Sequence, residues 1–135
     1  MALERDLRLA LLFIHLDKII FMKEFQLGEF EELVLLTIGI LNNVAYSIAV
    51  KDEMEDRLNR PVSLGALHTA LKRMEGKGYL KSYFGEAKEE RAGRPRKYFE
   101  ITATGKKALL FSKETRDTLW NAIPASNWQS SLKGI

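Results

Sequence analysis

The sequence predicts a mainly α-helical protein with a small antiparallel β-hairpin. Apolar residues recur at helical spacing in five stretches, and capping or breaking residues separate these stretches. Two short aromatic-rich segments flank a polar loop rich in arginine, a pattern typical of two strands joined by a long connection. The length of 135 residues fits one domain with a terminal extension.

The first expected helix covers residues 3–22, where Leu7 and Ile14 share one face. We assign residues 1–26 to an N-terminal helical extension, and Met22 is an alternative start of the protein. A membrane-spanning helix takes about 20 apolar residues, and no such run occurs in the sequence. The mixed charges of the first residues are not those of a signal peptide. We therefore expect a cytoplasmic protein without a membrane partner.

Two further helices follow from the next breaks in the pattern. Residues 29–41 are apolar nearly all round after an acidic first turn, which places this helix at the centre of the core. Ser47 is the expected N-cap of the next helix, which covers residues 48–58. The inner stripe of that helix consists of Val50, Met54 and Leu58.

The fourth helix has two different faces. Ser63 is its expected N-cap, and it runs to Glu75. One stripe is apolar and consists of Leu64, Leu67, Leu71 and Met74. The opposite face is small near its start and basic near its end, and consists of Gly65, Ala66, Thr69 and Arg73, flanked by His68 and Lys72. A bare surface lets the helix approach a nucleic-acid groove closely, so the longer side chains then reach bases or phosphates.

Residues 79–87 and 96–102 are the two expected strands. The loop between them is longer than a tight turn, and the basic cluster at this end of the hairpin consists of Arg91, Arg94, Arg96 and Lys97. Residues 60–97 hold ten basic and four acidic side chains, whereas residues 29–59 hold two basic and seven acidic ones. This separation of basic from acidic residues along the chain predicts a surface that faces a polyanion. A hairpin tipped with arginine can contact a DNA backbone or enter a minor groove. A merely solvated face is the alternative.

A fifth helix begins at a threonine cap, either Thr102 or Thr104, and ends before Pro124. A helix at the end of a small domain often packs on another subunit, so we expect residues 104–123 to form a dimerisation helix. Its expected interface residues are Leu109, Phe111, Ser112, Thr115, Leu119 and Trp120. Residues 124–135 are expected to form a tail.

The residue types that catalysis and metal binding need are scarce. Cysteine is absent, which excludes disulfides, thiolate metal sites and cysteine nucleophiles. The two histidines, His15 and His68, lie far apart in the sequence, so zinc sites and serine–histidine–aspartate catalysis are poorly supplied. Neighbouring acids such as Glu31 and Glu32 have no orienting histidine beside them. We expect no enzymatic activity, no metal and no cofactor.

The order of elements after the extension is that of a winged helix-turn-helix domain over residues 27–103. In this fold the helix over residues 63–75 reads the major groove, and the hairpin with its loop forms the wing. Winged helices also serve as protein-interaction modules, so an adaptor that binds another protein without DNA is the alternative function. A basic partner of that kind would meet the acidic face made by Asp52, Glu53, Glu55 and Asp56.

The motifs between Leu27 and Gly105 resemble those of the PadR family of bacterial transcriptional regulators. The matching segments are, in order, Gly28–Leu36, Tyr46, Val62–Glu75, Gly76–Leu80, Gly93–Phe99 and Ile101–Gly105. The Gly-Ala-Leu-x-x-Ala-Leu helix precedes the Gly-Arg-Pro-Arg-Lys-Tyr wing, as the family pattern requires. The resemblance implies a homodimer that binds a palindromic operator in double-stranded DNA and usually represses transcription, with release by a small molecule or another signal.

The resemblance also assigns the DNA-binding residues. Tyr46 would lie near a phosphate at a helix N-terminus. The recognition helix would use Ser63, Gly65, Ala66, His68, Thr69, Lys72 and Arg73, and the wing would use Arg91, Arg94, Arg96 and Lys97. Many members have Tyr-Pro where this chain has His68-Thr69, so the base preference does not transfer. One C-terminal helix with a short tail is typical of the short C-terminal subgroup. Some of that subgroup hold flat ligands between paired tryptophans, but Trp120 lies too far along the helix for that part, so no effector is assigned.

Overall fold

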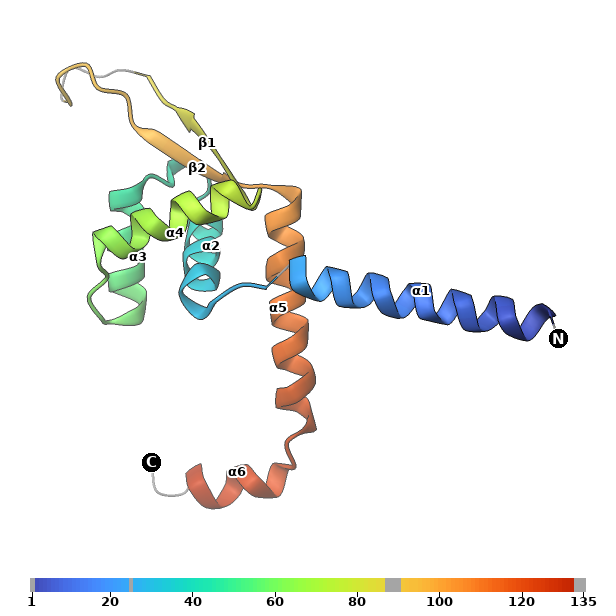
Figure 1. The fold of residues 1–135 in the computed structure, drawn as a ribbon. Coiled ribbons are helices and arrows are strands. Elements are labelled where there is room, and N and C mark those ends of the chain that lie inside the picture. The colour runs from blue at the N-terminus through green and yellow to red at the C-terminus, as the bar shows by residue number, and fades with distance from the viewer. Residues whose placement is uncertain (1, 25, 87–90, 133–135) are drawn as a thin grey trace.

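The computed structural model of the protein describes residues 2–24, 26–86 and 91–132. The elements follow one another as α1 (Ala2–Glu24), α2 (Glu29–Leu41), the 3-10 turn η1 (Asn42–Val44), α3 (Ser47–Leu58), α4 (Leu64–Gly76), β1 (Leu80–Phe84), β2 (Lys97–Ile101), α5 (Ala103–Ala122) and α6 (Ala125–Leu132) (Figure 1). This is the predicted winged helix-turn-helix architecture, mainly helical with one antiparallel hairpin and a C-terminal helix. Among the described residues, none of the helices combines the length and the apolarity needed to cross a bilayer.

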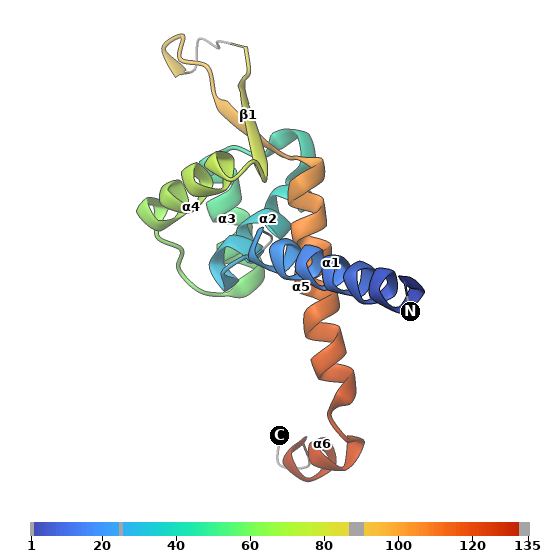
Figure 2. The ribbon, with the colours of Figure 1, turned by 45° about the vertical axis from the view of Figure 1, so that its right-hand side comes forward.

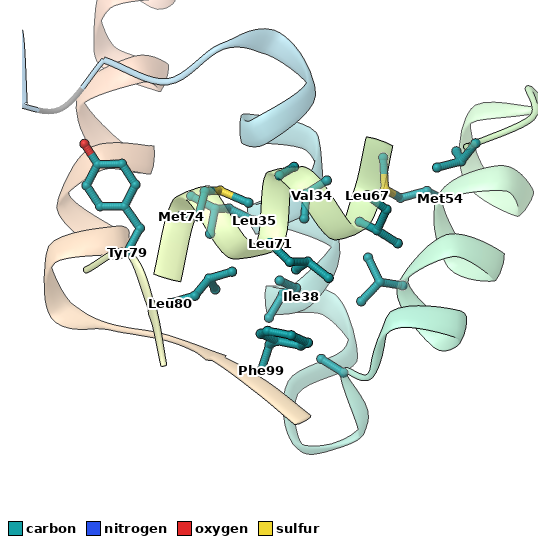
Figure 3. Packing of buried hydrophobic residues seen from close by; sticks show 14 of the residues in the cluster. Val34, Leu35, Ile38, Met54, Leu67, Leu71, Met74, Tyr79, Leu80 and Phe99 are labelled. Atoms are coloured by element: carbon teal, nitrogen blue, oxygen red, sulfur yellow. The ribbon is translucent and has the colours of Figure 1, made fainter. Parts of the chain in front are cut away.

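The hydrophobic core lies where α2, α3 and α4 meet the hairpin and the start of α5. Figure 3 shows that Leu35 and Ile38 of α2 lie among the buried residues of α4, including Leu67 and Leu71, with Phe99 of β2 nearby. Each of these large side chains is almost completely removed from solvent, which contributes about 1.5–3 kcal/mol per side chain. The core therefore fixes the angle at which α4 presents its other face to solvent.

The predicted cap at Ser63 is confirmed, and of the two candidate caps Thr102 and Thr104 the structure shows Thr102. The hydroxyl oxygen of Ser63 accepts a hydrogen bond from the backbone N–H of Ala66 at 3.2 Å, which begins α4. Thr102 caps α5 in the same way, accepting from the N–H of Gly105 at 3.0 Å. The hydroxyl of Thr102 also donates to the carbonyl of Gly78 at 2.6 Å, so this cap joins α5 to the end of α4.

The predicted cap at Ser47 is wrong. Helix α3 begins at Ser47 itself, and its N-cap is Tyr46, which makes no side-chain capping bond. The reason is a contact distant in sequence. Tyr46 forms an isolated antiparallel β-bridge with Tyr98, so the chain stays extended through Tyr46 and turns into helix directly afterwards.

The hairpin, which with its connection we call the wing, pairs β1 with β2 in antiparallel register, Tyr83 opposite Tyr98. It leaves the C-terminal end of α4 and extends beyond the helical body (Figures 1 and 2). Both strands are shorter than the sequence predicts. Residues 87–90, which belong to the predicted first strand and loop, lie outside the described residues.

Two expectations about packing are wrong. Leu36 and Ile40 of α2 are 46% and 51% exposed, because only part of this apolar helix faces α3, α4 and α5. Leu58, predicted to be on the inner stripe of α3, is also exposed at the end of its helix.

The expected tail contains a further helix, α6. Helix α1 projects from the body as a separate arm whose residues 2–17 are exposed (Figure 2).

Candidate nucleic-acid interface

The outward face of α4 is built as the sequence predicts. Its polar and small residues all lie exposed: Gly65, Ala66, His68, Thr69, Lys72 and Arg73. They do so because Leu67, Leu71 and Met74 are buried on the other side of the same helix. The hydroxyl of Thr69 donates to the carbonyl of Gly65 at 3.0 Å, one turn earlier, which fixes the side chain close to the helix surface. The start of α4 therefore presents a slim surface, with only the small residues Gly65, Ala66 and Thr69 beside His68.

A groove of about 710 Å³ separates α4 from the wing. Six of the residues predicted to bind DNA line this groove, which we call the wing groove: Tyr46, His68, Lys72, Arg91, Arg96 and Lys97. Three separate elements supply them, namely the N-terminus of α3, the flank of α4 and the wing. Leu71 and Phe99 also line the groove, so cationic groups stand beside an apolar surface.

The cations of the wing groove differ in how they are held. Lys97 lies 3.6 Å from Glu75, which also accepts a hydrogen bond from Ser82 at 2.5 Å. The guanidinium carbon of Arg96 stands 4.3 Å from the ring centroid of Tyr46. Within the described part of the chain, Lys72 and Arg96 form no ion pair. These two charges are therefore available to an anionic ligand without the loss of a carboxylate partner.

Arg73 lies on the other flank of α4, away from the wing groove. Its guanidinium is 3.3 Å from Glu31 of α2, and Lys77 approaches the second oxygen of the same carboxylate at 3.5 Å. The Glu31 side chain is only 10% exposed, whereas that of Arg73 is 59% exposed. A smaller hollow of about 400 Å³ here is lined by Ala66, Thr69 and Arg73. Arg73 is thus accessible as predicted, but its charge is shared with a carboxylate.

The remaining predicted residues lie outside both hollows. Ser63 and Gly65 mark the N-terminal end of α4, and Arg94 lies in the wing, where its carbonyl accepts a hydrogen bond from Arg91 at 3.2 Å. Glu75 also lines the wing groove, although we did not predict it as a site residue. Its spacing of three positions from Lys72 on a helix was the available signal, because such residues share a flank.

The acidic face of α3 is partly neutralised by its own helix. Glu53 accepts a hydrogen bond from Arg57 at 2.5 Å, and Glu55 accepts one from the ammonium of Lys51. The bond between the second pair lowers the pKa of Glu55 and raises the pKa of Lys51. Glu55 also accepts from the backbone N–H of Val62, which ties α3 to the turn before α4. Two of the four acids are therefore engaged within the domain.

Helix α5 carries the residues that we predict to form a dimer interface. Leu119 and Trp120 are 68% and 62% exposed at its far end, and Thr115 is exposed as well. Leu109 and Phe111 are half-buried because they pack against the core of their own chain. The ring of Trp120 stacks on that of Trp128 in α6, with centroids 4.8 Å apart and planes at 28°.

The architecture and this groove define a class: a winged helix-turn-helix protein with a basic, accessible fourth helix. The sequence profile of the transcriptional regulator PadR-like family matches residues 36–110, more than half of the chain. The protein belongs to this family of transcriptional regulators, and it is accordingly not an enzyme. Comparison with curated protein sequences finds no match.

Solved structures of similar fold carry the same family description. A PadR family transcription regulator from Clostridium difficile is 28% identical over 66% of this chain and 91% of its own, with a TM-score of 0.51. A PadR-like transcription factor from Bacteroides fragilis is 23% identical, with coverage of 74% and 88% and a TM-score of 0.59. A PadR family regulator from Eggerthella lenta is 21% identical, with coverage of 88% and 91% and a TM-score of 0.55. At 21–23% identity, the last two likenesses concern the fold.

Proposed function

We propose that the protein is a homodimeric repressor that binds a palindromic operator in double-stranded DNA through α4 and the wing. The observation that carries this proposal is the wing groove, where cations from α4 and the wing converge beside Tyr46 and the bare start of α4. A slim helix enters the major groove, and cations on either side of it meet the phosphates that border that groove.

Each part of the interface has its own task in this proposal. Thr69 and His68 lie on the accessible face of α4 and would contact base edges. Lys72 and Arg96 would neutralise phosphates, and Tyr46 would approach a phosphate at the N-terminus of α3. Arg94 would reach the backbone or the minor groove beside it, as arginine-tipped wings do.

Self-association is the second part of the proposal. We assign residues 27–103 to the winged-helix domain, 104–123 to a dimerisation helix, and 1–26 and 124–135 to terminal segments. Exposed Leu119 and Trp120 on α5 supply apolar surface that a second copy would cover. A two-fold axis would place two copies of α4 about 34 Å apart, which is one turn of the DNA helix. Because the two copies are related by this symmetry, the operator should be palindromic.

DNA selected from genomic fragments by the full-length protein tests the proposal directly. We expect a palindromic site, a dimer by light scattering, and affinity that falls steeply with salt because bound phosphates release counterions. A reporter gene behind the selected site should be silenced when the protein is present. A complex that salt does not weaken, or no complex with any fragment, contradicts the proposal. A protein partner that survives nuclease treatment while DNA binding is absent supports the adaptor.

A further inference from the structure

The base of the wing is joined to the helical domain through the residues before α3. Tyr46 forms a β-bridge with Tyr98, and the N–H of Phe99 donates to the carbonyl of Ala45 at 2.8 Å. The chain before α3 thus adds a short third strand to the hairpin. This junction borders the wing groove, because Tyr46 and Phe99 both line it.

Aromatic rings continue this connection across the wing. The ring of Tyr98 stacks on that of Tyr83, its partner on β1, with centroids 5.6 Å apart. On its other side, Tyr98 meets the ring of Tyr46 edge to face at 5.8 Å. Tyr46 in turn lies against the guanidinium of Arg96 at 4.3 Å. Tyr98 is not among the residues that line the wing groove, but its contact with Tyr46 connects it to Arg96, which does line it.

Gly85 follows β1 and is required by this arrangement. A Cβ atom at Gly85 would stand 2.5 Å from the Cε2 atom of Tyr98 and 3.2 Å from its Cδ2 atom. The N–H of Gly85 also donates to the carbonyl of Arg96 at 2.8 Å, so the backbone there cannot move away without the loss of this bond. A side chain at this position would therefore displace the Tyr98 ring.

We propose that Tyr98 is a positioning residue that holds the wing against the N-terminus of α3 and thereby aims Arg96 into the wing groove before DNA binds. The inference rests on the proposed DNA-binding function and deepens it. An arginine that is already oriented loses little side-chain freedom when it meets a phosphate, so affinity rises without an added contact. The geometry also explains why the wing needs glycine at position 85.

The test compares Tyr98→Leu and Gly85→Ala with Tyr98→Phe, which keeps the ring and serves as the control. Operator affinity is measured for each variant in the wild-type and in the Arg96→Ala background. We expect Tyr98→Leu to weaken binding about tenfold when Arg96 is present and about twofold or less when it is absent, because the ring contacts act through Arg96. Gly85→Ala should behave like Tyr98→Leu, and Tyr98→Phe like the wild type. An equal loss in both backgrounds, or no loss in either, overturns the inference.

A second measurement does not need DNA. Backbone N–H order parameters of residues 91–94 and 96 should be near 0.85 in the free wild type and fall toward 0.6 in Tyr98→Leu. Unchanged order parameters in that variant overturn the inference even if the protein binds DNA as proposed. If the wild type binds no DNA but the order parameters fall, the proposed function fails while the role of Tyr98 in fixing the wing stands.

Discussion

Lys72→Ala is the substitution whose effect on DNA binding follows most directly from the structure. Lys72 lies exposed on the flank of α4 that borders the wing groove, and it forms no ion pair with any described residue. Its removal leaves no carboxylate without a partner. Lys81→Ala is the matched control, because Lys81 lies on β1 outside the groove, pairs with Glu100 at 3.6 Å, and carries the same charge.

The magnitude comes from counterion release. One phosphate contact contributes about −0.9 to the slope of log affinity against log salt, so the loss of one contact reduces the steepness by roughly this amount. Between 50 and 200 mM salt, the ratio of wild-type to variant affinity should then shrink by about 3.5-fold. Fluorescence anisotropy with a labelled operator at four or five salt concentrations gives both slopes. Equal slopes for Lys72→Ala and the wild type, or an equal change in Lys81→Ala, would refute the assignment of Lys72 to the interface.

Three other substitutions test separate parts of the account. Thr69→Ala should change the base preference, at a cost of about 1–3 kcal/mol of binding free energy per lost base contact. If binding sites selected by the variant have the same consensus as those of the wild type, Thr69 contacts no base. Gly105→Ala should destabilise the fold by roughly 2 kcal/mol in urea titrations, because a Cβ there would lie 2.2 Å from the carbonyl oxygen of Tyr79. Gly76→Ala is the control and should be neutral or stabilising, because the space around Gly76 is open. Equal effects of the two substitutions on stability would contradict the close packing at Gly105. The pKa of Glu55 lies below its ordinary value because of its hydrogen bonds, so the stability it contributes is present above the unfolded-state pKa and is lost as pH falls through the folded value. The urea midpoints of wild type and Glu55→Gln should therefore differ at pH 7 and converge as the pH falls below the folded-state pKa, and a constant difference would refute the role of the charge.

The sequence predicts the elements whose signals are local. Ser63 is predictable as a cap, and Thr102 as one of two candidates beside Thr104, because a cap depends on a hydroxyl and an N–H three residues later. The exposed face of α4 was predictable for the same reason, since helical periodicity alone decides which of its residues oppose Leu67 and Leu71. The strongest parts of the candidate interface therefore came from short-range patterns.

Contacts between distant residues were not predictable in this way. Ser47 is a good capping residue by type, yet the bridge between Tyr46 and Tyr98 sets where α3 begins. Likewise, the pairing of Arg73 with Glu31 joins residues 42 positions apart, and no local rule indicates it. Such contacts depend on how the elements pack, which periodicity does not specify.

The exposed part of α2 has a related explanation. A run of apolar residues predicts burial on all sides, but within one chain only part of the surface of α2 is covered. Leu36 and Ile40 remain in contact with solvent. The sequence pattern indicates that a surface is apolar. It does not indicate whether the chain itself or another molecule covers that surface.

The central claim is that the accessible face of α4 sits in the major groove while the wing lies beside it. The chain has no cysteine, so Thr69→Cys provides one attachment point for a photo-crosslinker, with Lys81→Cys as the control on β1. On operator DNA, we expect crosslinks from position 69 to bases of the major groove in each half-site, and none from position 81. Efficient DNA binding with no crosslink from position 69 would contradict this claim.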